Sequence, residues 1–139
     1  MKYFIPIIVF LQISIFSHEL IKEATHDLMS EPQGTYQDKD CGEVKYSIEL
    51  KDLNKDNKKE VFVLKYGTCI GGITGINIDL LIEQDNTWHS QFNFSGYYQL
   101  LEENNLGFPD VMIIGRGLCF PIWRWNGIRY EFYKKSCNN

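Results

Sequence analysis

Apolar and polar residues alternate along much of this chain, in short runs separated by turn-forming residues. The clearest run covers residues 44–50, where every second side chain is apolar: Val44, Tyr46, Ile48 and Leu50. A period of two predicts a strand with one buried face. Further strands are predicted at residues 61–64, 76–82, 88–94, 111–114, 120–125 and 128–133, whereas residues 97–101 fit either a strand or a helical turn. We therefore expect a mainly β fold, an antiparallel meander of about seven to eight short strands that forms a sandwich or an open barrel.

Two pairs of these strands are predicted to form hairpins. Residues 44–50 and 61–64 flank a polar loop at residues 52–60. The last two strands flank Asn126-Gly127, which favours a two-residue turn because both residues tolerate positive φ. Such a turn fixes the register and pairs residues on one side of the hairpin, Trp125 with Ile128, Trp123 with Tyr130 and Pro121 with Phe132. On the other side it places Arg124 opposite Arg129.

The N-terminal residues form an almost unbroken apolar run over residues 3–16, after Lys2. A membrane-spanning helix needs about 20 apolar residues, so this run predicts a secretory signal peptide over residues 1–17. A buried N-terminal helix or strand is the alternative. Residues 18–40 are expected to form a short helix, Glu19–Met29, followed by a linker. Residues 41–139 are expected to form the β domain.

Charge and cysteine content limit where the protein works and what it binds. The 139-residue chain has a formal net charge of −4 and no cluster of Lys and Arg, so neither nucleic acid nor an anionic membrane is an expected partner. Its four cysteines predict two disulfides in an exported, periplasmic or secreted protein. Four cysteines allow three connectivities; the two hairpins favour Cys41–Cys69 and Cys119–Cys137.

The loop at residues 52–60 places oxygen-bearing side chains at alternate positions. Calcium binds six to eight oxygen ligands, which a tight loop can present in this way. The candidate ligands are side-chain oxygens and one backbone carbonyl, from Asp52, Asn54, Asp56, Lys58 (carbonyl) and Glu60. The alternative is a polar turn in which the acidic residues face solvent and pair with neighbouring lysines. Val63 stands at the twelfth position, so the loop is not an EF-hand.

This stretch resembles the calcium loops of FG-GAP and VCBS repeats, over residues 48–66. Asn57 takes the place of the usual glycine, and only one copy is present. More broadly, the layout is similar to that of small exported bacterial proteins, mostly of unassigned function, with an Asp-Leu-Asn loop, a Cys/Gly-rich turn at residues 69–75 and a final Trp/Asn-Gly/Tyr hairpin. The resemblance implies an extracytoplasmic β domain and no particular reaction.

The first functional hypothesis is a non-catalytic exported module that binds another protein, such as an inhibitor or immunity protein. Trp, Tyr and Arg are enriched at binding hot spots, so the candidate partner-binding residues are Arg116, Trp123, Arg124, Trp125 and Arg129. The alternative is that the aromatic side of this hairpin belongs to the core.

Two other classes of function are weighed against a binding module. One is a structural envelope protein stabilised by Ca²⁺ in the 52–60 loop. The other is a hydrolase, which needs a base and has only His89 in the β domain, with Asp79 on the neighbouring strand. Ser90 follows His89 directly, so it points to the other face of the strand and cannot be its nucleophile.

Overall fold

The computed structural model of the chain describes residues 33–137. Within them the chain forms nine strands: β1 (Gly34–Asp38), β2 (Gly42–Lys51), β3 (Glu60–Tyr66), β4 (Ile76–Gln84), β5 (Thr87–Ser95), β6 (Tyr97–Asn105), β7 (Phe108–Ile114), β8 (Cys119–Trp125) and β9 (Tyr130–Cys137). A short helix, α3 (Thr68–Gly71), and a 3₁₀ turn, η1 (Gly72–Thr74), connect β3 to β4.

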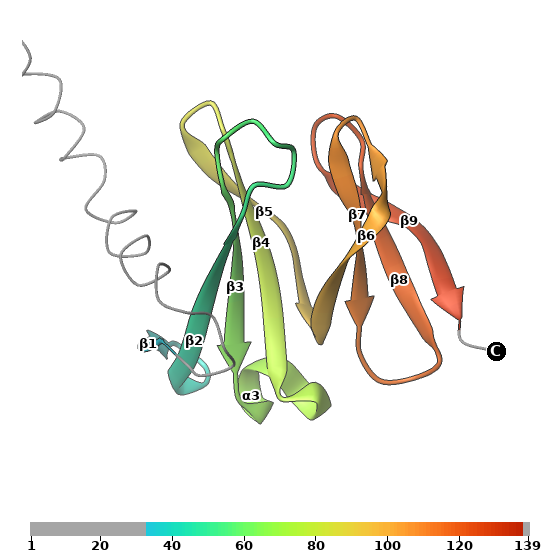
Figure 1. Cartoon of the computed structure of the whole chain (residues 1–139). Coiled ribbons are helices and arrows are strands. Elements are labelled where there is room, and N and C mark those ends of the chain that lie inside the picture. Colours follow the sequence, from blue (N-terminus) through green and yellow to red (C-terminus); the bar gives the residue numbers. More distant parts are fainter. Residues whose placement is uncertain (1–32, 138–139) are drawn as a thin grey trace, which may run out of the picture.

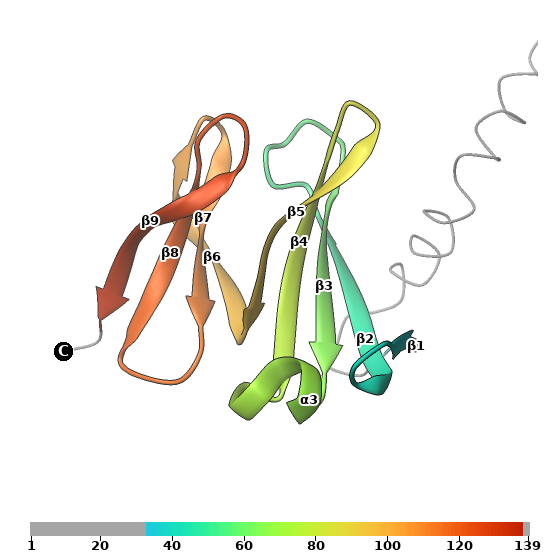
Figure 2. The same ribbon diagram turned by 180° about the vertical axis from the view of Figure 1, so that it is seen from behind.

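The strands form two antiparallel sheets, each a simple meander. The five-stranded sheet has the order β1-β2-β3-β4-β5 and the four-stranded sheet the order β6-β7-β8-β9 (Figures 1 and 2). A single residue, Gly96, separates β5 from β6. Its φ is +133°, and a Cβ atom there would lie 2.4 Å from the carbonyl oxygen of Ile114. Only glycine therefore fits where the chain passes from one sheet to the other.

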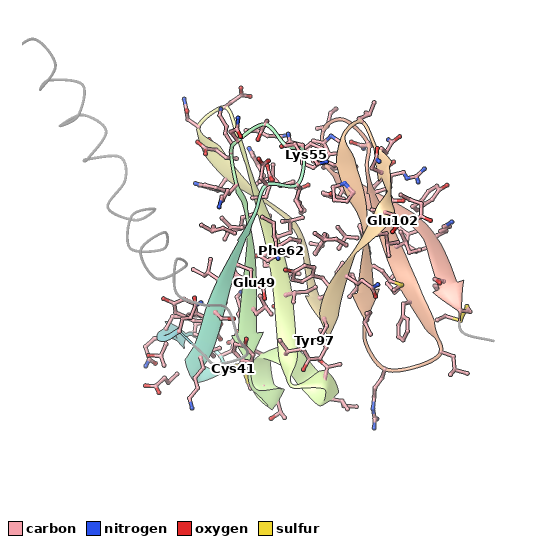
Figure 3. All side chains as sticks on the ribbon, in the orientation of Figure 1. Cys41, Glu49, Lys55, Phe62, Tyr97 and Glu102 are labelled. Atoms are coloured by element: carbon pink, nitrogen blue, oxygen red, sulfur yellow. A yellow bond between two sulfur atoms is a disulfide. The ribbon has the colours of Figure 1, made fainter. Side chains whose placement is uncertain are left out.

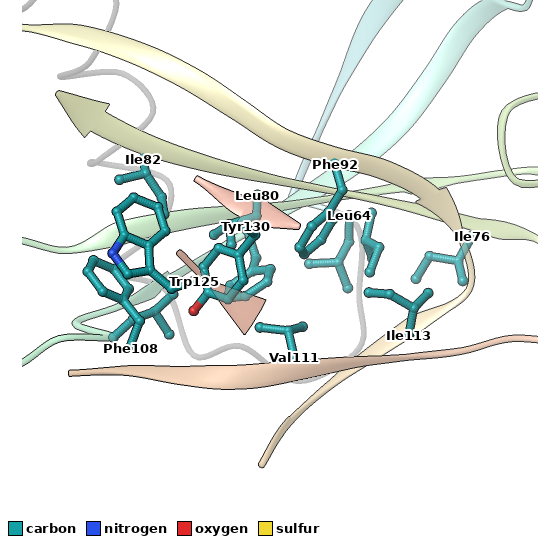
Figure 4. Packing of buried hydrophobic residues seen from close by; sticks show 13 residues of the cluster. Leu64, Ile76, Leu80, Ile82, Phe92, Phe108, Val111, Ile113, Trp125 and Tyr130 are labelled. Carbon is teal, nitrogen blue, oxygen red and sulfur yellow. The ribbon is translucent and has the colours of Figure 1, made fainter. Parts of the chain in front are cut away.

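One hydrophobic core lies between the two sheets. The five-stranded sheet contributes Phe62, Leu64, Ile76, Ile78, Leu80, Ile82 and Phe92, and the four-stranded sheet contributes Phe108, Val111, Ile113, Trp125 and Tyr130 (Figure 4). Tyr98 of β6 stacks on Phe62 with ring centroids 3.8 Å apart, and its hydroxyl donates a hydrogen bond to Glu49. Phe62 and Glu49 are labelled in Figure 3. The predicted β fold is thus confirmed as two sheets with a shared core, and not as a closed barrel.

The register of β2 determines which of its faces meets this core. Ser47 pairs with Leu64 and Glu49 pairs with Phe62, so these two polar residues lie on the inner face. The alternate residues, including Val44 and Ile48, point away from the four-stranded sheet. Their partners on β3 and β4 lie on the same outer face: Val61, Val63, Lys65, Asn77, Asp79 and Leu81.

Of three predictions about the N-terminal part, one needs correction and two lie outside the described residues. The linker expected to run to residue 40 is wrong over residues 34–38, because these form β1 and pair with β2. The predicted helix Glu19–Met29 and the predicted signal peptide lie outside the described residues. The α-helix that the structure does describe, α3, lies between β3 and β4 rather than at the N-terminus.

The final hairpin has a longer loop than the two-residue turn predicted from Asn126-Gly127. Trp125 pairs with Tyr130, and Arg124 pairs with Glu131 rather than with Arg129. The side-chain oxygen of Asn126 accepts hydrogen bonds from the backbone N–H groups of Ile128 and Arg129, both at 2.9 Å. These bonds stabilise a loop over residues 126–129, and a bulge in the ladder places Trp123 opposite Phe132.

Both predicted disulfides are present. Cys41 is bonded to Cys69, and Cys119 is bonded to Cys137 directly across the β8–β9 ladder. Two disulfides fit an oxidising environment. Among residues 33–137, no helix has the length and apolar character needed to cross a membrane.

Candidate functional site

Four loops lie together at one end of the two sheets, seen at the top of Figure 1: residues 52–59, 85–86, 106–107 and 126–129. We refer to them as the loop end. Two contacts hold neighbouring loops in place. The side-chain amide of Gln84 donates to the carbonyl oxygen of Ile128 at 3.0 Å. Leu106 lies against Gly127, so closely that a Cβ atom added to this glycine would be 3.4 Å from the Leu106 Cδ1. The loop end is therefore a connected surface built from both sheets.

Side-chain oxygens within the 52–59 loop accept its own backbone N–H groups. The two carboxylate oxygens of Asp52 accept the N–H groups of Asp56 at 3.1 Å and Asn57 at 2.9 Å. Asp56 accepts the N–H of Lys58 at 2.8 Å, and this bond is the main reason that the pKa of Asp56 is lowered. Asn57 has a φ of 66°, as expected for the residue that replaces glycine.

Glu60 closes the base of this loop from the inside. It is 5% exposed, and its carboxylate accepts the N–H of Leu53 at 2.7 Å. Burial raises the pKa of Glu60, and the charges of Asp56 and Asp52 add to the rise. Glu60 also contributes to a raised pKa of the buried Tyr130, for which burial is the larger cause. A buried carboxylate near two others favours a proton or a cation.

The predicted calcium ligands fit a cation only in part. The side-chain oxygen of Asn54 is buried and accepts no hydrogen bond, which leaves one oxygen unsatisfied inside the loop. Carboxylate oxygens that already accept one N–H keep a further lone pair. However, no three Asp, Glu, His or Cys side chains within residues 33–137 are grouped closely enough to hold a metal ion. The calcium site thus stays a prediction.

Two large apolar side chains are exposed at the loop end. Leu106 is 69% exposed and Ile128 is 72% exposed. Two exposed cationic residues lie at the loop end as well. Arg129 follows Ile128 in the 126–129 loop, and Lys55, labelled in Figure 3, lies on the 52–59 loop. Sequence reasoning missed both apolar residues, because alternation places Ile128 in a strand and Leu106 lies within a turn signal. The clue available in the sequence was that Leu106, an apolar residue, stands between the turn-forming residues Asn105 and Gly107.

The residues predicted to bind a partner do not form one surface. Trp125 is 5% exposed and stacks on Phe108 in the core, with ring centroids 4.3 Å apart. Trp123 packs against the same core. Arg116 lies in the β7–β8 loop, at the end opposite to Arg129 (Figure 1). The alternative interpretation, that the aromatic side of this hairpin belongs to the core, agrees with the structure.

Arg124, another predicted contact residue, is engaged within the protein. Its guanidinium forms an ion pair with Asp110 at 2.8 Å and lies over the ring of Tyr133, 3.8 Å from its centroid. Its hydrogen bond with Asp110 is the main cause of a raised pKa of Arg124. Asp110 is 1% exposed, so Arg124 neutralises a buried carboxylate.

The pair proposed for a hydrolase is not brought together. His89 pairs with Ile82, whose side chain lies in the core, whereas Asp79 pairs with Asn93 on the outer face. Ser90, not His89, contacts Asp79, and its hydroxyl donates a hydrogen bond of 2.6 Å. Burial raises the pKa of Asp79 despite this bond. A serine and a carboxylate without a histidine do not make the arrangement that activates a serine nucleophile.

Comparison with known proteins adds no family to this description. No family model matches the chain, and neither the curated proteins nor the solved structures give a significant match.

Proposed function

We propose that this protein is a non-catalytic, exported binding module that uses its loop end to contact another protein, as an inhibitor or immunity protein does. The observation that carries the proposal is the pair of exposed apolar side chains, Leu106 and Ile128, on loops that contact each other. Apolar contacts fixed on a rigid scaffold lose little conformational entropy on binding. Flanking cationic residues favour a partner that offers an apolar pocket bordered by carboxylates.

The opposite end of the molecule supplies matched controls. Leu118 is 73% exposed and Arg116 is exposed, both in the β7–β8 loop. They repeat the residue types of Leu106 and Arg129 at the other end. A substitution at one end can therefore be compared with the same substitution at the other.

The test is capture of a partner by the oxidised protein from extracts of its own cells and of competing bacteria, followed by affinity measurements on the purified pair. Leu106→Asn suits the positive φ of 51° at this position. This variant and Arg129→Glu are each expected to weaken binding about tenfold or more. Leu118→Asn and Arg116→Glu are expected to leave the affinity unchanged. Equal losses at both ends, or no partner at all, would contradict the proposal.

A second candidate is a structural role for Ca²⁺ in the 52–60 loop, favoured by the unsatisfied oxygen of Asn54. The ion would be held by Asp52, Asn54, Asp56, Glu60 and the carbonyl of Lys58, and would offset the repulsion among the carboxylates. A rise in Tm with millimolar Ca²⁺, abolished by Asp56→Ala and retained in Asp40→Ala, would support it. No shift in Tm would exclude this role.

A further inference from the structure

The outer face of the five-stranded sheet carries a group of apolar side chains, mainly on β2 and β3, with Lys65, Asn77 and Asp79 beside them. Ile48, Leu50, Val61, Val63 and Leu81 share this face, which points away from the four-stranded sheet. We refer to them as the outer stripe. None of these residues belongs to the hydrophobic cluster between the sheets. In a two-sheet fold such a face normally carries polar side chains that meet water.

Burial on this face is deepest at Val44 and Ile48, whereas the other residues of the outer stripe, Leu50, Val61, Val63 and Leu81, are half-buried. Ile48 is 1% exposed and Val44 is 4% exposed. On the same face, the hydroxyl of Tyr36 is buried and has no hydrogen-bond partner, and burial is the main cause of its raised pKa. Among the described elements, β2 packs mainly beside its neighbours β1 and β3. A segment outside residues 33–137 would complete this face.

The chain itself enters at the edge of this face. The N–H of Gln33 donates to the carbonyl oxygen of Tyr46 at 2.8 Å, and the side-chain oxygen of Gln33 accepts the N–H of Ile48 at 3.0 Å. These two bonds hold Gln33 beside β2, between Tyr46 and Ile48. Any segment that directly precedes Gln33 starts next to the outer stripe.

Residues 19–29 have the composition and length to cover it. Their apolar residues recur at helical spacing: Leu20, Ile21, Ala24, Leu28 and Met29. A helix rises about 1.5 Å per residue, so this segment would span about 16 Å. Adjacent strands lie about 4.8 Å apart, and the segment therefore matches the width of the three strands that carry the outer stripe. Pro32 and Gly34 allow the chain to turn between the helix and β1.

We propose that residues 19–29 of this chain dock as an amphipathic helix on the outer stripe and complete the fold as a third layer. The interface is intramolecular and apolar, formed by the side of the helix that carries Ile21 and Leu28. The opposite side, which carries Lys22 and His26, faces solvent. This proposal is independent of the loop end, which lies on other residues.

The test uses the full chain with methyl-labelled isoleucine and valine and a soluble paramagnetic agent that broadens exposed methyl signals. In the natural sequence, the methyl groups of Ile48 and Val63 are expected to be protected to a similar degree as that of Ile78. The double variant Ile21→Asp/Leu28→Asp is expected to increase the broadening of Ile48 and Val63 several-fold. Ile78, on the inner face, reports that the variant is still folded.

Control variants separate this proposal from its alternatives. Lys22→Asp/His26→Asp introduces the same number of acidic residues on the other side of the segment and should leave Ile48 protected. Continued protection of Ile48 in Ile21→Asp/Leu28→Asp, with Ile78 also protected, would overturn the proposal. Exposure of Ile48 by Leu11→Asp instead would assign the cover to residues 3–16. A dimer in sedimentation that buries Ile48 would assign it to a second copy, and both results would also overturn the proposal.

Discussion

The outer faces of the two sheets differ in how they are completed. On the four-stranded sheet, Asp110 is buried by its own neighbours, because Arg124 pairs with it and Tyr133 covers the guanidinium. On the five-stranded sheet, Ile48 is buried to the same degree, but on a face that it shares with other apolar side chains. The four-stranded sheet buries one apolar side chain on its outer face as well, Ile122 at 4% exposure, whereas the five apolar residues of the outer stripe lie together on one face and favour another layer. We therefore expect the five-stranded sheet, rather than the four-stranded one, to carry the additional segment proposed above.

The largest effects are expected from two isoleucines that differ only in the face they occupy. Ile78→Ala opens a cavity between the sheets and should lower the free energy of unfolding by about 2–5 kcal/mol. If the outer stripe is covered, Ile48→Ala should cost a similar amount in urea unfolding. A loss below about 0.5 kcal/mol for Ile48→Ala, typical of surface positions, would show that the outer face is bare and would remove the contrast.

The next effects concern the disulfides, one for each sheet. Replacing both cysteines of Cys41–Cys69 by Ala should lower the free energy of unfolding by about 3 kcal/mol, and the same change at Cys119–Cys137 by about as much. The two loops that these bonds close have similar lengths, with separations of 28 and 18 residues. Thermal and urea unfolding of both double variants checks this. A negligible loss for one pair would show that its sheet is already restrained without the bond.

A smaller loss is expected when the outer face of the four-stranded sheet is opened. Arg124→Ala leaves the carboxylate of Asp110 buried without a cation, and should shift the urea midpoint clearly downward. Arg129→Ala, an exposed arginine in the adjacent loop, is the matched control and should have no measurable effect. Adding Asp110→Asn to Arg124→Ala should recover part of the loss, because the amide carries no charge. Equal midpoints for Arg124→Ala and Arg129→Ala would show that the ion pair contributes nothing.

The smallest effect concerns Glu60, the buried carboxylate of the five-stranded sheet, for which no ion pair is found in residues 33–137. Its pKa is raised by burial, so the folded state binds the proton more tightly than the unfolded state. The Glu60 contribution to stability is therefore lost as pH rises through the raised pKa. With a chelator present, Glu60→Gln should raise Tm slightly at pH 7. The difference in Tm between the variant and the natural protein should disappear in acid, below the unfolded pKa of about 4.3. A lower Tm at pH 7 would contradict this assignment.

Much of the fold follows from alternation in the sequence, and the departures have identifiable causes. Residues 44–50 and 76–82 are recognisable as strands because their apolar side chains recur at every second position. Alternation does not say which side meets the other sheet, and in β2 the apolar side faces outward. Strand β1 escapes prediction because Gly34–Asp38 has only one apolar side chain, Tyr36, and pairs at an edge.

The candidate site is harder to predict than the fold. The disulfide partners follow from hairpin geometry and are confirmed. The prediction of a two-residue turn at Asn126-Gly127 is wrong because the side chain of Asn126 binds two N–H groups further along, which lengthens the loop and moves Ile128 to the surface. Residue type alone predicts Trp and Arg as contacts, whereas their neighbours place Trp125 in the core and Arg124 on Asp110. Contacts between loops distant in sequence, such as Gln84 with Ile128, carry no local signal.

The purely sequential order of the strands has a consequence for oxidative folding. Within each sheet, every strand pairs with the one next to it in the chain, so each hairpin needs only a short loop to close, which is the fast kind of contact to form. Cys119 and Cys137 meet when β8 and β9 pair, and Cys41 and Cys69 meet when β2 and β3 pair. The native thiols therefore become neighbours before distant parts of the chain assemble. Mispaired thiols should be rare when the reduced chain is oxidised, even without an isomerase.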